Sequence, residues 1–197
     1  IGELTALTRS QKVWVVPTKS LFERWFSPVP ADSLLKQPGM QYMPQATLAR
    51  WKQVKQEYLE DPSWDPEKWQ RFDRIRLRLI RALSEEGHGL LLGSDAPQLF
   101  NVPGFSIHHE IDGMQRAGIP NAEILRMATL YPAQFFGISE EIGTIQAGKR
   151  AEFILVDGNP LEAPEHLRNL RGVMLSDRWI SQAEITTKLE EIAGKLH

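Results

Sequence analysis

The chain contains 197 residues, no cysteine, and 25 acidic against 23 basic side chains, which gives a formal net charge of -2. This balance offers no electrostatic footprint for nucleic acid or an anionic membrane, and no apolar run approaches the ~20 residues that a membrane span needs. Without cysteine there is no disulfide and no thiolate metal site, so a metal ion would need nitrogen and oxygen ligands.

The first part of the chain, residues 1–86, combines one short strand with a long helical excursion. A leading helix is followed by an expected strand at Lys12–Val16, after which several prolines interrupt the chain. Apolar residues recur every three to four positions over Pro44–Glu60, which predicts an amphipathic helix. A second helix should begin at Pro66, because Asp65 is a suitable N-cap and proline suits the first helical position.

Large apolar side chains gather in the irregular part of this excursion, and two interpretations of them stay open. These residues are Trp25, Phe26, Met40, Tyr42 and Met43. They line a pocket at the mouth of an active site, or they seal the excursion against the rest of the protein.

One carboxylate, Asp95, follows a short apolar run that is bounded by glycines. The run Gly89–Gly93 is typical of a fully buried strand, and in parallel α/β folds the active site lies where such strands end. The residues from Ser94 to Pro97 are also ordinary turn formers, among which an aspartate caps a loop. From these residues alone, Asp95 is either a turn former or a functional carboxylate.

Two helices are expected after this strand. Ser106 is suited to cap the first of them, and Ala117–Asn121 combines a helix stop with a new N-cap. The adjacent residues His108 and His109 point about 100° apart on a helix, so they are poorly placed to share one metal ion.

The last part of the chain changes from helical to strand periodicity. Strands are expected at Gly143–Lys149 and Phe153–Val156, the second of them buried, and a hairpin is expected over Val173–Ile180. The stretch Thr186–Lys195 is typical of a terminal helix that packs through one apolar face.

Five motifs between residues 89 and 162 resemble, in order and spacing, the C-terminal part of the metal-dependent amidohydrolase superfamily, in its imidazolonepropionase-like and prolidase-like branches. The motifs are Gly89–Pro97, Ile107–Gly118, Ile124–Thr129, Pro132–Gly137 and the pair formed by Ile142–Asp157 with Asn159–Leu161. Upstream, Val13–Thr18 resembles the seventh strand of the family's barrel, with Lys19 at a position where leucine is usual.

The resemblance implies an α/β fold: a partial TIM (β/α)8 barrel made of strands 7 and 8 with their helices, plus part of a small β-sandwich domain. The expected divisions are residues 1–137 for the barrel part, 138–185 for strands of the sandwich, and 186–197 for a C-terminal helix. A complete barrel takes roughly 250 residues, so we expect the chain to be a C-terminal fragment. Strands that lack partners also predict a homo-oligomer or association with the missing N-terminal half.

The resemblance also implies the site. Members of the family hold one or two divalent metal ions with ligands from several strands, and the eighth strand supplies an aspartate. This position corresponds to Asp95, which would ligate the metal, accept a proton from the attacking water and pass it to the leaving nitrogen. The implied ion is a divalent metal, expected to be zinc, in the intact enzyme. The other ligands fall outside this sequence, so the fragment alone is expected to lack a complete site. His109 would be a substrate-binding residue behind the Asp95 loop.

The implied reaction is hydrolysis of a carbon-nitrogen bond in a small-molecule amide, cyclic amide or dipeptide. The alternative hypothesis is a non-catalytic truncated module that is used for association. A related barrel hydrolase that acts on phosphoesters or carbon-halogen bonds is not distinguished by the residues present. The sequence predicts no nucleic-acid partner and no membrane span, and it leaves localisation open between cytoplasm and periplasm.

Overall fold

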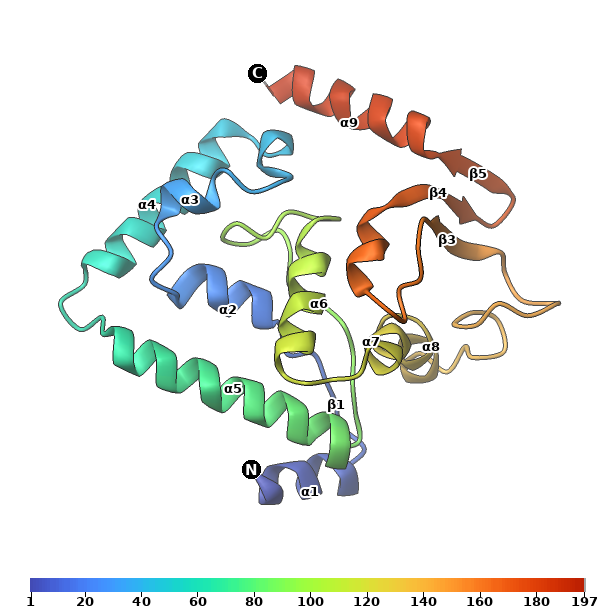
Figure 1. Cartoon of the computed structure of the whole chain (residues 1–197), viewed down its shortest axis with the longest axis horizontal. Coiled ribbons are helices and arrows are strands. Elements are labelled where there is room, and N and C mark those ends of the chain that lie inside the picture. Colours follow the sequence, from blue (N-terminus) through green and yellow to red (C-terminus); the bar gives the residue numbers. More distant parts are fainter. Residues whose placement is uncertain (197) are drawn as a thin grey trace.

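The computed structural model describes residues 1–196, which form a mainly helical part around a short parallel strand pair, followed by a three-stranded antiparallel sheet (Figure 1). The helical excursion lies on one side of helix α6 (Ser106–Arg116) and the antiparallel sheet lies on the other (Figure 1). No helix within these residues combines the length and the apolar character that crossing a membrane requires.

Two parallel strands position the candidate site. Helix α1 (Gly2–Ser10) leads into β1 (Trp14–Val15), which pairs with β2 (Gly89–Leu90). Glycine is required at position 89, because a Cβ there would lie 2.3 Å from the Trp14 ring. Beyond the pair, the Leu91 amide donates to the Val15 carbonyl at 2.9 Å, so the apolar run stays extended. Both predicted strands are present but are shorter than expected, and their carboxyl ends lie at the same edge.

The connection between β1 and β2 is the predicted helical excursion. It contains α2 (Lys19–Phe26), α3 (Ala31–Leu34), the 3-10 turn η1 (Met40–Tyr42), α4 (Gln45–Glu60) and α5 (Pro66–Glu86). The predicted start of α5 is confirmed, since the Asp65 carboxylate accepts a hydrogen bond of 2.8 Å from the Glu67 amide. A crossover of this length allows the two strands to run in the same direction.

Two apolar clusters hold the helical part together. The first packs α5, β2, α6 and α7 (Asn121–Ala128) against one another, with Leu90 and Met114 each only 1% exposed. The second joins the excursion to the chain that follows Asp95, through Trp51 and Phe100, whose ring centroids lie 5.7 Å apart. The loop after Asp95 is therefore anchored in the excursion.

Helices α6, α7 and α8 (Leu130–Phe135) follow the Asp95 loop. The predicted stop after α6 is confirmed, with Gly118 at φ +82°. Asn121 begins α7 but does not cap it, because its side-chain amide donates to the carbonyls of Leu161 and Glu162 instead.

The C-terminal part contains β3 (Glu152–Val156), η2 (Pro164–Arg168), β4 (Leu170–Leu175), β5 (Arg178–Ser181) and α9 (Gln182–Leu196). The three strands pair in the antiparallel order β3-β4-β5, which confirms the predicted hairpin.

Two expectations for this part are wrong. Gly143–Lys149 forms turns rather than a strand, since no described strand lies beside it and the Lys149 ammonium instead donates to Thr144 Oγ1 at 2.7 Å. Strand β3 is not buried: Ile154 and Leu155 are 48% and 53% exposed, because β3 is at the edge of a small sheet. Helix α9 also begins four residues earlier than expected, and none of its described residues is buried.

Candidate active site

Asp95 lies beyond the carboxyl end of β2, in a loop where its own backbone is left-handed, with φ at +57°. Aspartate tolerates this conformation better than most side chains do. The side chain is exposed, and no hydrogen bond or ion pair of its carboxylate is found among residues 1–196. The carboxylate therefore does not cap the local turn, which was the alternative that the sequence left open.

The Asp95 loop is held in place by hydrogen bonds of three buried polar residues, Ser94, Asn101 and Ser106, of which Asn101 was not singled out from the sequence. The Asn101 amide donates to the Ser94 carbonyl at 2.5 Å and to the Ser20 hydroxyl at 3.3 Å. The hydroxyl groups of Ser94 and Ser106 lie 2.8 Å apart. The backbone around Asp95 is thus tied both to α2 and to the start of α6.

Glu110 joins α6 to the start of α2. Its carboxylate is fully buried and accepts hydrogen bonds from the backbone amides of Lys19 and Ser20, at 2.9 and 2.7 Å. These amides are the free donors of a helix N-terminus, where a negative charge is also favoured by the helix dipole. Burial raises the pKa of Glu110, while the two amide bonds act in the opposite direction.

Lys19 is buried at the position where the family resemblance leads us to expect leucine. Its ammonium contacts the carboxylates of Glu23 and Asp73, and Glu23 also contacts Arg116. Burial lowers the pKa of Lys19 to about 8, and the hydrogen bond and charge of Asp73 oppose this effect. A buried amine is tolerated here because acidic partners surround it.

His109 lies on α6 beside Asp112, with 3.9 Å between its Nδ1 atom and an Asp112 oxygen. Burial lowers the pKa of His109 to about 3, and the charges of Arg24 and Arg168 add to this effect, so the imidazole is neutral near pH 7. Asp112 itself is held by Arg168, whose guanidinium reaches both carboxylate oxygens at 3.0 Å. In the part of the chain that the structure describes, no hydrogen bond or ion pair connects His109 with Asp95.

No group of three or more histidine, aspartate or glutamate side chains within residues 1–196 is arranged to hold a metal ion. His88 precedes β2, so it lies at the opposite end of the strand from Asp95, where its ring packs 4.8 Å from that of Trp14. The described residues can offer Asp95 as one ligand, and by themselves they do not fit a divalent ion.

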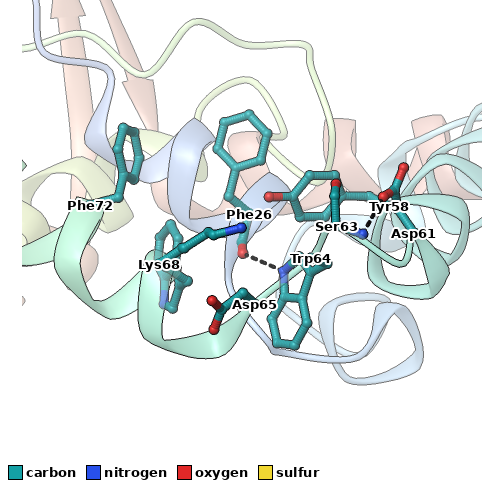
Figure 2. A pocket seen from close by; sticks show the side chains of 9 residues that line it. Phe26, Tyr58, Asp61, Ser63, Trp64, Asp65, Lys68 and Phe72 are labelled. Carbon is teal, nitrogen blue, oxygen red and sulfur yellow. Dashed lines mark hydrogen bonds between the residues drawn. The ribbon is translucent and has the colours of Figure 1, made fainter.

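An aromatic cavity of about 320 Å³ lies in the excursion, between α2, α4 and α5 (Figure 2). Phe26, Tyr58, Trp64 and Phe72 are among its walls, and the Trp64 indole donates to the Phe26 carbonyl at 3.4 Å. No residue of the Asp95 loop lines it.

The apolar residues of the excursion could line a pocket or seal the excursion against the rest of the protein, and the structure shows which of them do each. Phe26 lines the aromatic cavity, whereas Met40 is buried in the second apolar cluster, with Trp25 and Met43 packed against that cluster. Tyr42 stacks on Phe105, with 5.4 Å between the ring centroids. Four of the five residues therefore seal the excursion.

Comparison with known proteins gives concordant matches. The sequence profile of the amidohydrolase family matches residues 66–183. An N-substituted formamide deformylase from Arthrobacter pascens is 31% identical over 108 residues, which make up 50% of this chain and 20% of that protein. A 5-methylthioadenosine/S-adenosylhomocysteine deaminase from Moorella thermoacetica is 51% identical over 39 residues, 20% of this chain and 9% of that protein.

Two solved structures share the fold. The bottromycin amidohydrolase superimposes with a TM-score of 0.73 at 24% identity, over 93% of this chain and 40% of its own. A Xaa-Pro dipeptidase with bound methionine in its active site gives a TM-score of 0.61 at 21% identity, over 91% of this chain and 37% of its own. The chain thus spans at most about two fifths of the length of these four relatives.

Proposed function

Since this chain belongs to the amidohydrolase family, we propose that it is the C-terminal part of a hydrolase that acts on carbon-nitrogen bonds and that Asp95 is its contribution to catalysis. The names of three relatives, a formamide deformylase, a deaminase and a dipeptidase, all describe cleavage of such a bond. The observation that carries the proposal is the exposed Asp95 carboxylate, which follows a parallel strand and has no partner in the described chain.

In this proposal β1 and β2 are the seventh and eighth strands of a (β/α)8 barrel. Their parallel pairing and the long helical crossover between them support the assignment, because barrel strands are parallel and are connected through helices. The antiparallel strands β3, β4 and β5 would be part of a small β-sandwich domain.

Asp95 would accept a proton from the attacking water on one carboxylate oxygen and return it to the leaving nitrogen. A carboxylate can both accept and release this proton, whereas an asparagine at the same position cannot accept it. The fixed backbone around Asp95, tied by Asn101 and Ser94, would keep the carboxylate in position for both transfers.

A divalent metal ion, with zinc as the expected ion, is proposed only for the intact enzyme. Because the described residues do not fit such an ion by themselves, the remaining ligands would come from polypeptide outside them. His109 is proposed as a substrate-binding residue, since a neutral imidazole can both donate and accept a hydrogen bond. The proposed substrates are small-molecule amides, cyclic amides or dipeptides.

The experiment replaces Asp95 with asparagine in the natural polypeptide that carries this chain. Hydrolysis of N-formyl amines and dipeptides is measured, with Asp177→Asn in the β4-β5 turn as a matched control. We expect kcat/KM to fall by at least about 100-fold in Asp95→Asn and to stay within twofold in the control. Turnover close to that of the parent in Asp95→Asn, with an unchanged circular dichroism spectrum, would contradict the proton-transfer role.

A second candidate, an association module, is favoured by the exposed apolar residues of the antiparallel sheet. Ile154, Leu155 and Leu175 are 48%, 53% and 51% exposed. If the natural polypeptide hydrolyses none of these amides and binds no zinc, but forms assemblies that Leu155→Lys disrupts, association replaces hydrolysis as its function.

A further inference from the structure

A second cavity, of about 300 Å³, lies outside the Asp95 region, between α2, α5 and the end of α6. Its charged walls are Glu23 and Arg24 from α2, Asp73 from α5 and Arg116 from α6. None of the residues that line it belongs to the Asp95 loop, so it is separate from the proposed catalytic carboxylate.

The acidic residues of this cavity already have cationic partners. Glu23 contacts Lys19 and Arg116, and Asp73 contacts Lys19. Each carboxylate is thereby neutralised within the network. Lys19, Arg24, Arg76 and Arg116 supply four positive charges against the three negative charges of Glu23, Asp73 and Glu110, which leaves an excess of one positive charge.

Arg24 is the cation that this network does not neutralise. Arg24 is only 6% exposed, and no carboxylate in residues 1–196 comes within salt-bridge distance of its side chain. Its one hydrogen bond there runs from a terminal nitrogen to Gln37 Oε1, at 3.2 Å, while the buried Nε atom has no partner. Burial lowers the pKa of Arg24 to about 10, in keeping with an incompletely compensated guanidinium.

Two carboxylates outside the cavity act on Arg24 without forming an ion pair with it. Asp112 and Glu110 both favour its charged form. Asp112 is engaged by Arg168, however, and the charge of Glu110 also acts on the guanidinium of Arg76. A buried charge without a partner is costly, so a bound anion would be stabilised here.

We propose that this cavity binds a small organic monocarboxylate, whose carboxylate group pairs with the guanidinium of Arg24. A single negative charge neutralises the excess, whereas a phosphate dianion would be repelled by Glu23 and Asp73 in the same cavity. The Gln37 amide nitrogen provides a further donor, and Trp69 and Leu34 provide apolar surface for the rest of the ligand. This inference does not depend on the hydrolase activity.

The test is a calorimetric titration of the full chain with propionate as the probe, with 1-propanol as its neutral counterpart and inorganic phosphate as the dianion. We expect saturable one-to-one binding of propionate, with affinity at least tenfold higher than for either of the other two compounds. Equal or tighter binding of phosphate, or of the neutral alcohol, would overturn the proposal.

Two substitutions locate the site. Arg24→Gln should weaken binding at least tenfold, whereas Arg71→Gln, an exposed arginine of α5 without a partner in the described residues, should leave it unchanged. Gln37→Glu places a carboxylate beside Arg24, so it should abolish binding and also raise the unfolding temperature. This second variant keeps the test valid if Arg24→Gln does not fold. Unaltered probe binding in Gln37→Glu would overturn the proposal.

Discussion

Replacing Lys19 with leucine tests whether a buried amine is stabilised by its carboxylate partners. The Lys19 side chain is fully buried, and its partners Glu23 and Asp73 are 17% and 20% exposed. Removing one partner of a buried ion pair costs about 3–5 kcal/mol, because the other charge stays buried. Glu23 keeps its contact with Arg116, so the uncompensated charge is that of Asp73. Since Asp73 is partly exposed, we expect a loss of about 3 kcal/mol in the free energy of unfolding.

The measurement is urea unfolding at pH 7, with the slope of the transition compared among variants. The double variant Lys19→Leu/Asp73→Leu should recover most of the loss, because apolar replacement of a whole buried pair is often neutral. Lys52→Leu is the matched control: it breaks the pair with Asp32, in which the side chains are 40% and 67% exposed, and should cost less than about 1 kcal/mol. A similarly small cost for Lys19→Leu, or a double variant no more stable than the single one, refutes the reasoning.

Two further substitutions probe α6. Glu110→Ala removes the acceptor of two backbone amides at the start of α2, so the free energy of unfolding should fall by about 2–3 kcal/mol, and an unchanged urea midpoint would contradict this role. The pKa of His109 is about 3 in the folded chain against 6.5 for the free side chain, so the unfolded state takes up its proton first and stability falls as pH drops from 6.5 towards 3. His109→Gln should make this loss shallower in urea unfolding at pH 7, 5.5 and 4.5, and parallel profiles for the two proteins would contradict the assignment.

Features that depend on neighbouring residues could be predicted from the sequence. The start of α5 follows from Asp65 and Pro66 alone, and the β4-β5 hairpin follows from a local turn between two strand-forming runs. The carboxylate at the end of the second strand could also be singled out, since a short apolar run before an aspartate is a local signal.

Features that depend on residues far away in the sequence could not be predicted. The expected strand at Gly143–Lys149 did not form, because a strand needs a neighbour and the described residues provide none there. The positions of Lys19, Asn101 and Glu110 are set by contacts across many residues, so no local pattern marked them as buried. For Lys19 a signal was present in the departure from the usual leucine, which indicated a changed environment without showing which acids would surround it.

The contact between Glu110 and the start of α2 has a consequence for synthesis of the chain on the ribosome. The two backbone amides that donate hydrogen bonds to Glu110, those of Lys19 and Ser20, are 91 and 90 positions away from it in the sequence. A nascent polypeptide that ends before residue 110 therefore lacks the buried acceptor of these two amides, which are solvated by water at that stage. The contact that fixes the start of α2 to the rest of the fold is added only after α6 has emerged from the exit tunnel, long after α2 itself.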